Sequence, residues 1–368
     1  MTIYWKNYGS YPRLARVVNI ASDECNDVVA DGYEHLLIEH GLVSFLSDAY
    51  SLSIDDESPF YSLKTGDVIS VDDRGIVHVQ YAQKDNDACL FITGHCNSNC
   101  VMCPSSDSER KSYEEITLNW FQDFLNLLPP ETGHFTMTGG EPTLNTELFF
   151  EVMSLVADKF PDAETLLLTN GRSFAARSMM SRLMVRCPQY LRVAIPIHGP
   201  TPQTHDEITQ AVGSFRETSM GIRHLLDAGI AVELRVVVSK LNYMLLCDIA
   251  DYIINNFPNA LVVNFIGLET RGSCAKNYKE VYISLPDAAR AAIPAIDKLT
   301  RAGVDAALYN FPLCAVNRGY WSICKNSISP DKIRFPEECE ECEARMTCGG
   351  FFNTTLSMAK PTVHPVHF

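Results

Sequence analysis

Three closely spaced cysteines constrain this chain more than any other feature. Cys96, Cys100 and Cys103 stand in the run HCNSNCVMCP, with the spacing C-x3-C-x2-C. Iron–sulfur clusters normally take four cysteines, so three thiolates on one loop can bind three irons of a [4Fe–4S] cube and leave the fourth iron open to a small molecule. A zinc knuckle or three unrelated thiols are the alternatives, but zinc sites prefer paired C-x2-C units with four ligands. The spacing therefore predicts an iron–sulfur cluster.

Composition narrows the class of protein and its partners. The chain has 368 residues, 46% of them hydrophobic, with a formal net charge of -15 and thirteen cysteines. An acidic chain is a poor partner for nucleic acid, which is bound through basic patches. No apolar run approaches the roughly 20 residues of a membrane span, and the N-terminal residues lack the apolar core of a signal peptide. We expect a cytoplasmic protein whose cysteines bind metal or clusters rather than form disulfides.

Three segments follow one another along the chain: residues 1–87, 88–310 and 311–368. The first is β-rich, with two runs of strand-forming residues, Val68–Val71 and Ile76–Tyr81, joined by a turn in which Gly75 can take a positive φ. This pattern predicts a hairpin within a small barrel or sandwich. The third segment is rich in Cys, Pro and Gly and has too little apolar periodicity for a core of its own, so a metal or cluster would stabilise it.

The middle segment alternates short apolar strands with helices, which predicts an α/β fold with a parallel sheet. The predicted strands are Cys89–Thr93, His134–Met137, Thr165–Leu168, Leu191–Ile197, Val232–Val238 and Leu261–Phe265. One predicted helix, TELFFEVMSLVADKF, starts after the natural N-cap Asn145. Another is entered through Ser284 and closed by Gly303, and Pro294 inside it should kink it or shift its start.

The cysteine motif follows a predicted strand and precedes a helical stretch, and it resembles the fingerprint of the radical S-adenosylmethionine (SAM) superfamily. The resemblance implies a partial (β/α)6 barrel, whose site would lie at the C-terminal ends of the strands. It also implies that SAM chelates the open iron through its amino and carboxylate groups. An electron from the cluster would then cleave SAM to methionine and a 5′-deoxyadenosyl radical, which abstracts hydrogen from the substrate.

A second motif, Gly139-Gly140-Glu141-Pro142, follows the predicted strand HFTMT. Two glycines let the backbone approach a ligand closely, and a carboxylate with carbonyls after a strand suits an ammonium group. A simple strand-to-helix turn is the alternative. In the resembled superfamily this motif binds the amino group of SAM.

Polar or glycine residues end two more predicted strands. Thr169-Asn170 could reach the ribose or carboxylate of SAM, or form an ordinary turn. Gly267 stands in the run Ile266-Gly267-Leu268-Glu269, which resembles the adenine-contacting loop of the superfamily and is otherwise a plain loop.

Two further residues have a functional and a structural interpretation. Arg235 lies inside the apolar strand VELRVVV, where an arginine needs an anionic partner; the SAM carboxylate is one candidate and Glu233 is another. His198 ends the fourth predicted strand and faces either SAM or substrate, or is simply a hydrogen-bonded structural residue. The segment after it, from His205-Asp206 to Gly213-Ser214-Phe215, resembles a recurrent stretch of radical SAM peptide maturases.

Five cysteines cluster near the C-terminus and predict a second metal site. Cys339, Cys342 and Cys348 are spaced C-x2-C-x5-C, and either Cys314 or the alternative Cys324 completes the set, with Cys314 preferred. Four cysteines suit an auxiliary [4Fe–4S] cluster or, less well, zinc. The five remaining cysteines are expected to be small buried side chains: Cys25, Cys89, Cys187, Cys247 and Cys274.

The C-x2-C-x5-C spacing resembles the SPASM extension of peptide-modifying radical SAM enzymes. That pattern continues with a cysteine at a position where this chain has Phe352. The resemblance therefore implies one auxiliary cluster, as in the shorter "twitch" version, and not two.

The sequences around both cysteine sets are CNSNCVMCPSS, LYNFPLC and CEECEARMTCGGFF. They resemble the corresponding sequences of the radical SAM maturases of His-Xaa-Ser systems (HxsC). The resemblance implies radical modification of a peptide or protein, alongside a second radical SAM maturase and a small accessory protein. It also implies an electron donor such as flavodoxin or ferredoxin. Two alternatives stay open: a radical SAM enzyme of small-molecule cofactor or modified-base biosynthesis, and a non-catalytic metal-binding partner of another maturase.

Overall fold

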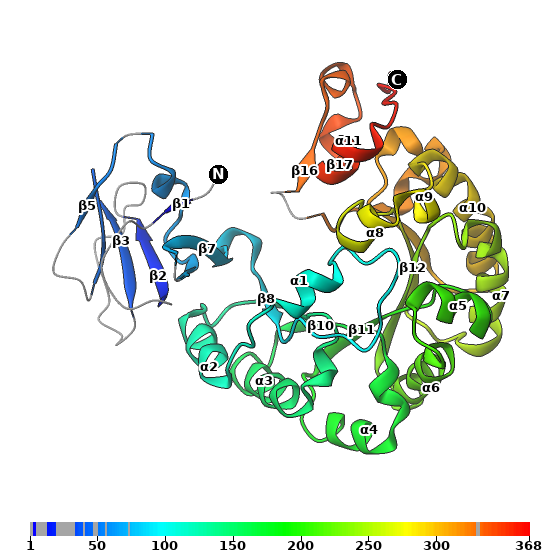
Figure 1. Ribbon diagram of the computed structural model, residues 1–368, viewed down its shortest axis with the longest axis horizontal. Helices are drawn as coiled ribbons and strands as arrows, with labels where there is room; N and C mark the ends of the chain where they lie inside the picture. Colours follow the sequence, from blue (N-terminus) through cyan, green and yellow to red (C-terminus); the bar gives the residue numbers. More distant parts are fainter. Residues whose placement is uncertain are drawn as a thin grey trace.

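The computed structural model of the chain describes residues 3–4, 13–19, 34–39, 41–46, 51–55, 57–72, 74–328 and 332–368. Figure 1 shows two β-sheets of different kinds, one near the N-terminus and one, curved and lined with helices, in the larger part of the molecule. In the part of the chain described, no helix is both long and apolar enough to cross a membrane.

The N-terminal strands form one seven-stranded sheet with its own hydrophobic core. Its order is β1-β7-β6-β2-β3-β4-β5, from β1 (Ile3–Tyr4), β2 (Arg13–Asn19), β3 (His35–Glu39), β4 (Leu42–Phe45), β5 (Leu52–Ser53), β6 (Val68–Val71) and β7 (Ile76–Tyr81). The predicted hairpin is confirmed, because β6 and β7 pair antiparallel and Gly75 between them has a φ of 76°. The described strands belong to one sheet and not to the two layers of a sandwich.

The larger sheet is an eight-stranded parallel sheet whose spatial order follows the chain, from β8 to β15. Its strands are β8 (Asp87–Phe91), β9 (His134–Thr138), β10 (Glu164–Leu168), β11 (Tyr190–Pro196), β12 (Ala231–Val237), β13 (Val262–Ile266), β14 (Ala306–Tyr309) and β15 (Cys324–Lys325). All six predicted strands are present within two residues of their predicted ends, which confirms the α/β fold. β14 and β15 extend the sheet beyond the six predicted units.

The strands of this sheet alternate between a helix-covered face and an inner face, as the two-residue period of a strand requires. On β12, Val232, Leu234 and Val236 are fully buried in the main hydrophobic core. Glu233 and Arg235 therefore point to the opposite, concave face of the curved sheet. Polar side chains on this concave face lie inside the partial barrel.

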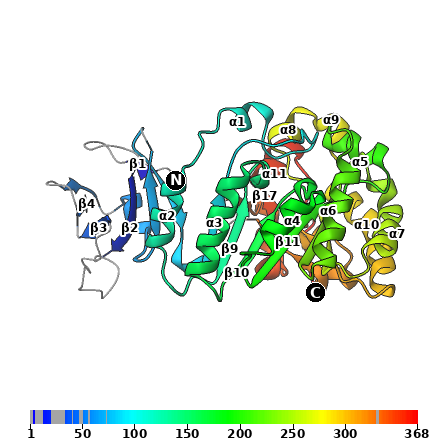
Figure 2. The same cartoon turned by 90° about the horizontal axis from the view of Figure 1, so that it is seen from below.

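Helices cover the outer face of the sheet, with α2, α3, α4, α6, α7 and α10 along the convex arc in Figure 1. The helices are α1 (Asp107–Lys111), α2 (Leu118–Leu127), α3 (Thr146–Lys159), α4 (Arg177–Leu183), α5 (Pro202–Thr209), α6 (Ser214–Asp227), α7 (Leu246–Asn256), α8 (Gly272–Lys276), α9 (Tyr278–Val281), α10 (Leu285–Arg301) and α11 (Asn353–Ala359). Figure 2 shows the N-terminal sheet at one end of the molecule and α10 at the other.

The two helices predicted from their caps are present. The side chain of Asn145 accepts a hydrogen bond from the Leu148 backbone at the start of α3. The Ser284 hydroxyl caps α10 by accepting from the Asp287 backbone. Pro294 does not shift the start of α10, because the helix runs through it from Leu285 to Arg301.

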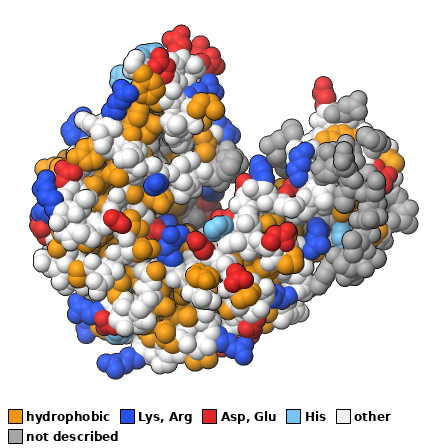
Figure 3. Space-filling view, turned by 180° about the vertical axis from the view of Figure 1, so that it is seen from behind, with side chains coloured by type: hydrophobic (Ala, Val, Ile, Leu, Met, Phe, Trp, Pro, Cys, Tyr) orange, Lys and Arg blue, Asp and Glu red, His pale blue; other side chains and the backbone are white. Residues whose placement is uncertain are grey.

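The C-terminal segment shares the core of the barrel. β15 pairs with β14, and Phe311, Cys339 and Phe351 belong to the main hydrophobic cluster. A short antiparallel pair, β16 (Ile333–Arg334) and β17 (Phe351–Phe352), leads into α11. In Figure 3 the opposite face is hollowed between the lobe of this segment and the lobe of the N-terminal sheet, and acidic, basic and histidine side chains lie in the hollow.

Candidate functional site

The loop after β8 carries the three cysteines of the first motif. Their thiols lie close enough for the charges of Cys96 and Cys103 to affect Cys100, and burial raises the pKa of Cys100 to about 12. Burial also raises the pKa of Cys96, although the Ser98 backbone, which donates to its Sγ at 3.4 Å, lowers it. Metal coordination deprotonates such thiols outright. Three half-buried thiols with nearby hydrogen-bond donors therefore fit a cluster that neutralises their charge.

Segments far along the chain brace this cysteine loop. The Asn99 and Val101 backbones donate to the Thr209 and Ile208 carbonyls at the end of α5, at 2.9 and 3.0 Å. The side chain of Asn277 donates to the Val101 carbonyl at 2.9 Å. The loop is therefore fixed by elements that follow β11 and β13, on the C-terminal edge of the sheet.

The two glycines of the GGEP motif pack against the residues that lead into Cys96. A Cβ on Gly139 would lie 2.4 Å from the Thr93 carbonyl oxygen, and one on Gly140 would lie 2.4 Å from the Gly94 and His95 oxygens. The Gly140 backbone donates to the Thr93 carbonyl at 2.8 Å. These glycines allow two loops to touch, in addition to any role they have toward a ligand.

The third residue of that motif, Glu141, is fully buried and tied to the end of the next strand. Its Oε1 accepts from the hydroxyls of Thr143 and Thr169 at 2.6 and 2.7 Å, and its Oε2 accepts from the Asn170 backbone at 2.6 Å. Burial raises the pKa of Glu141, and these hydrogen bonds oppose that rise. The structure thus brings together the predicted GGEP and Thr169-Asn170 positions, while Pro142 starts a buried turn beside them.

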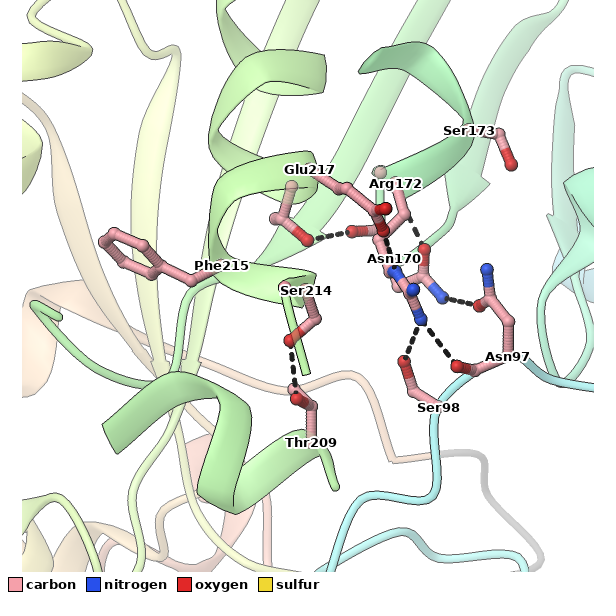
Figure 4. Close-up of polar contacts among 12 residues, drawn as sticks. Asn97, Ser98, Asn170, Arg172, Ser173, Thr209, Ser214, Phe215 and Glu217 are labelled. Carbon is pink, nitrogen blue, oxygen red and sulfur yellow. Dashed lines mark hydrogen bonds and ion pairs between the residues drawn. The ribbon is translucent and has the colours of Figure 1, made fainter. Parts of the chain in front are cut away.

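A polar network joins the loop after β10 to the cysteine loop (Figure 4). The Asn170 side chain donates to Asn97 Oδ1 at 2.6 Å, and Arg172 Nη1 donates to the Asn97 carbonyl at 2.5 Å and to the Ser98 hydroxyl at 3.3 Å. Arg172 is itself held by Glu217 on α6, at 2.6 Å. Sequence reasoning missed Arg172, because an arginine after Asn-Gly carries no motif until its partners are known.

A second missed residue is Arg110 on α1, which is only 8% exposed. Its Nη1 donates to Cys103 Sγ at 3.2 Å and its Nη2 to Asn99 Oδ1 at 2.5 Å. A guanidinium therefore touches a predicted cluster ligand directly. The only sequence signal was its position seven residues after Cys103.

Several polar residues of the segment after β11 have structural partners. Asp206 caps α6 by accepting from the Gly213 and Phe215 backbones at 2.6 and 2.8 Å, and the Ser214 hydroxyl donates to it as well. The His198 backbone donates to His205 Nδ1 at 3.2 Å. This stretch therefore holds α5, α6 and the end of β11 together.

His198 itself is buried at the end of β11. Its ring lies against His205, and burial lowers the pKa of His198 to about 3, so the ring is neutral. Its Nδ1 has no hydrogen-bond partner among the residues the structure describes. Both predicted interpretations of His198 stay open.

Arg235 has an anionic partner on its own strand. Its Nε donates to Glu233 Oε1 at 2.6 Å, and Arg192 lies 3.9 Å from the other carboxylate oxygen. The Arg235 side chain is 22% exposed and that of Glu233 only 3%. The half-buried arginine thus forms the structural pair that was the alternative to the SAM carboxylate.

Gly267 follows β13 and packs against the Asn310 carbonyl, which a Cβ would meet at 2.8 Å.

The C-terminal cysteines separate into a set of four and a single residue. Cys314, Cys339, Cys342 and Cys348 line one small cavity. Burial raises the pKa of Cys339, and the nearby charges of the other three raise it further. Cys324 does not line that cavity, and among these cysteines only Cys348 affects its pKa.

Backbone N–H groups surround the sulfurs of this set. Leu313 and Gly350 each donate to Cys348 Sγ at 3.4 Å, and Val366 donates to Cys342 Sγ at 3.4 Å. Val363 and His364 also line the cavity. Residues 363–366 therefore form part of its wall, and such donors stabilise thiolates that ligate a cluster.

Within the described ranges, no three His, Cys, Asp or Glu side chains lie close enough to hold one metal ion. A cube binds each cysteine through a different iron, so its ligands spread further apart than those of a single ion.

Five further cysteines were expected to be buried, and among those that the structure describes only Cys274 is. Cys89 is exposed, Cys187 and Cys247 are half-buried, and Cys25 lies outside the described residues. Cys89 is exposed because it faces the open concave side of β8.

Comparisons with known proteins agree with this geometry. Residues 90–252 match the model of the radical SAM superfamily. The AdoMet-dependent heme synthase of Methanosarcina barkeri (strain Fusaro / DSM 804) is 27% identical over 153 residues, which are 41% of this chain and 42% of the synthase. The antilisterial bacteriocin subtilosin biosynthesis protein AlbA of Bacillus subtilis (strain 168) is 25% identical over 240 residues, 61% of this chain and 51% of AlbA.

Among solved structures, Streptococcus suis SuiB bound to its precursor peptide SuiA matches with a TM-score of 0.49 and 14% identity, over 60% of this chain and 48% of SuiB. The chain spans about half or less of the length of the curated relatives it matches. The matched residues include the cysteine loop, the GGEP turn and strands β9 to β12. Residues 90–252 therefore carry a radical SAM domain.

Proposed function

We propose that this protein is a radical SAM enzyme whose first cluster is held by Cys96, Cys100 and Cys103. The observation that carries the proposal is the cysteine loop itself, at the C-terminal edge of a parallel sheet where Glu141, Thr169 and the loop meet. When bound, the cluster and SAM supply an electron and a 5′-deoxyadenosyl radical that removes hydrogen from the substrate.

The residues of the chain position these groups. Glu141 locks the GGEP turn to the end of β10. The backbone carbonyls of Gly139 and Gly140 in that turn are the groups that we propose for the ammonium group. Asn170 and Arg172 tie the end of β10 to the cysteine loop. The Gly267 turn lies at the same edge of the sheet, after β13. These contacts support a site in which the loops after β8, β9 and β10 are held together.

We infer that the second set of cysteines binds an auxiliary [4Fe–4S] cluster through Cys314, Cys339, Cys342 and Cys348. Their shared cavity and the backbone donors around it support this set, and the place of Cys324 outside the cavity argues against it as the fourth ligand. Four cysteine ligands leave no iron open to the substrate, so this cluster transfers electrons or shapes the substrate end of the barrel.

A peptide or protein is the substrate class we propose, with a His-Xaa-Ser type system as its setting. One relative is named for the biosynthesis of a bacteriocin and another, SkfB of Bacillus subtilis, for the maturation of a sporulation killing factor. The C-terminal cysteines and the sequences around both cysteine regions also support a peptide or protein substrate. A second radical SAM maturase, a small accessory protein and a flavodoxin or ferredoxin are the proposed partners.

A second candidate is the modification of a small molecule, because three of the curated relatives are AdoMet-dependent heme synthases. The same cofactor chemistry serves both candidates, so the substrate separates them. Incubation with SAM, dithionite and either a His-Xaa-Ser peptide or a tetrapyrrole, followed by mass spectrometry, decides which one loses hydrogen.

The activity is tested by anaerobic reconstitution with iron and sulfide, iron analysis, and addition of SAM and dithionite. About eight irons per chain with release of 5′-deoxyadenosine are expected for two clusters. About four irons with cleavage would restrict the cluster to the first site and make the C-terminal set a zinc site. A full first cluster without 5′-deoxyadenosine, even with the substrate and partner proteins added, would favour a non-catalytic metal-binding role.

A further inference from the structure

Arg110 places one buried positive charge beside all three cysteines of the first motif. It donates to Cys103 Sγ at 3.2 Å, and its charge lowers the pKa of both Cys96 and Cys100, against the effect of burial. Neither the cysteine motif nor the GGEP motif contains this residue. Its position calls for a role beyond holding the loop.

The charge of Arg110 is largely uncompensated by the protein. Among the described residues its one ion pair is with Asp107, at 3.8 Å, and Asp107 is 52% exposed. Its other contacts are neutral, with Asn99 Oδ1 and the Ser105 carbonyl. Since a buried charge is screened little by water or salt, its field acts mainly on the sulfurs it faces.

Helix α1 holds the guanidinium in this place. The Ser106 hydroxyl accepts from the Glu109 backbone, and the Glu109 carboxylate accepts from the Ser106 backbone, which closes a capping box at the start of the helix. Arg271, from the loop after β13, contacts Glu109 in turn. The orientation of Arg110 is therefore set by local helix capping and by a distant loop.

We propose that Arg110 is a positioning residue that raises the reduction potential of the cluster held by Cys96, Cys100 and Cys103. This inference rests on the proposed function, which places the cluster there. Reduction adds one electron to the cluster, so the reduced form carries one more negative charge than the oxidised form, and a nearby cation stabilises it. Arg110 thus makes the cluster easier to reduce by a donor such as flavodoxin.

The neighbouring residue supplies a matched control. Lys111 is on the same helix, but its side chain is 73% exposed and pairs with Asp107 at 2.7 Å. R110Q and K111Q each remove one positive charge from α1, and only R110Q removes it from the sulfurs. R110K keeps the charge but loses the planar fork of donors.

The test is a redox titration of the reconstituted full chain with dithionite, followed by electron paramagnetic resonance. The signal that changes on addition of SAM belongs to the cluster with the open iron, which separates it from the auxiliary cluster. For R110Q we expect the ratio of reduced to oxidised cluster at a fixed potential to fall about tenfold, or about 59 mV for a one-electron couple. K111Q should change it less than about twofold, and R110K less than about threefold.

A wild-type potential in R110Q, or an equal shift in K111Q, would overturn the proposal. If R110Q does not retain iron, R110K decides the matter, because a tenfold shift with the charge kept would mean that hydrogen-bond geometry and not charge sets the potential. A wild-type cluster that fails to cleave SAM would refute the proposed function but leave the comparison of potentials valid.

Discussion

The carboxylate of Glu141 accepts a 2.6 Å hydrogen bond from the backbone N–H of Asn170, and both residues belong to motifs that were predicted to bind a ligand. The bond links the turns after β9 and β10. It means that the acid of the GGEP motif is used within the protein to hold two loops of the site in register.

Replacing Glu141 by glutamine should weaken the fold. The amide nitrogen of Gln would face a backbone N–H, that of either Asn170 or Thr143, and leave it unsatisfied in the core. We expect a loss of about 1–3 kcal/mol in the free energy of unfolding, measured with urea. Glu147→Gln is the control: that side chain is 80% exposed, so its replacement should leave stability nearly unchanged. An equally stable E141Q protein would contradict this account.

The pair of buried histidines should make the protein sensitive to mild acid. Burial lowers the pKa of His205 to about 4, Asp206 opposes this shift and Arg172 adds to it. In the unfolded chain His205 binds a proton below about pH 6.5, whereas in the folded protein it does so only below about pH 4. The stability that His205 contributes is therefore complete above about pH 6.5 and is lost as the pH falls toward about 4. The loss is about 3 kcal/mol.

His205→Asn keeps an acceptor for the His198 backbone but removes this titration. Urea unfolding at pH 7.5 and pH 5 should show a smaller loss of stability in H205N than in the wild type. The same pH dependence in both proteins would mean that His205 does not contribute to it.

The fourth ligand of the auxiliary cluster is tested by two serine substitutions. C314S should lose about four irons per chain, because Cys314 lines the cavity of the other three cysteines. C324S is the matched control and should keep its iron. The reverse result would assign the site to Cys324 and require the 324–348 region to rearrange on loading.

The salt bridge on β12 predicts the effect of removing Arg235. R235A leaves the buried Glu233 carboxylate without its main partner, and we expect a loss of about 3 kcal/mol in the free energy of unfolding. The double variant E233A/R235A should recover much of that loss. The dissociation constant of the double variant for SAM, measured by calorimetry, should stay within about threefold of the wild-type value. A hundredfold weaker affinity would instead assign Arg235 to the SAM carboxylate.

Local signals were sufficient to predict the strands and helices of the barrel. The strands β9 to β13 are five to seven residues long and bury apolar side chains on one face, and these apolar residues mark them in the sequence. Asn145 and Ser284 predicted the starts of two helices because an N-cap side chain binds the backbone N–H only three residues later. β15 was missed because it has only two residues and pairs through its backbone.

The candidate site was predictable only where its residues form a short sequence motif with a fixed spacing. Cysteines at fixed intervals and a GGEP turn can be read directly, but Arg110 and Arg172 act through partners that fold next to them from other loops. The glycines of GGEP were interpreted as making room for a ligand, whereas part of their purpose is contact with residues 93–95. The capping role of Asp206 was likewise hidden, because its partners lie seven to nine residues later.

The bracing of the cysteine loop has a consequence for how the protein is made. Asn277, which holds the Val101 carbonyl, follows it by 176 residues. At about 5–20 residues per second, a ribosome needs roughly 10–35 s to reach it. The three thiols of the first motif therefore emerge well before the loop can be fixed, and the strands add to the sheet in chain order during that interval. Cys96, Cys100 and Cys103 thus wait for this brace while the 176 residues from Val101 to Asn277 are synthesised.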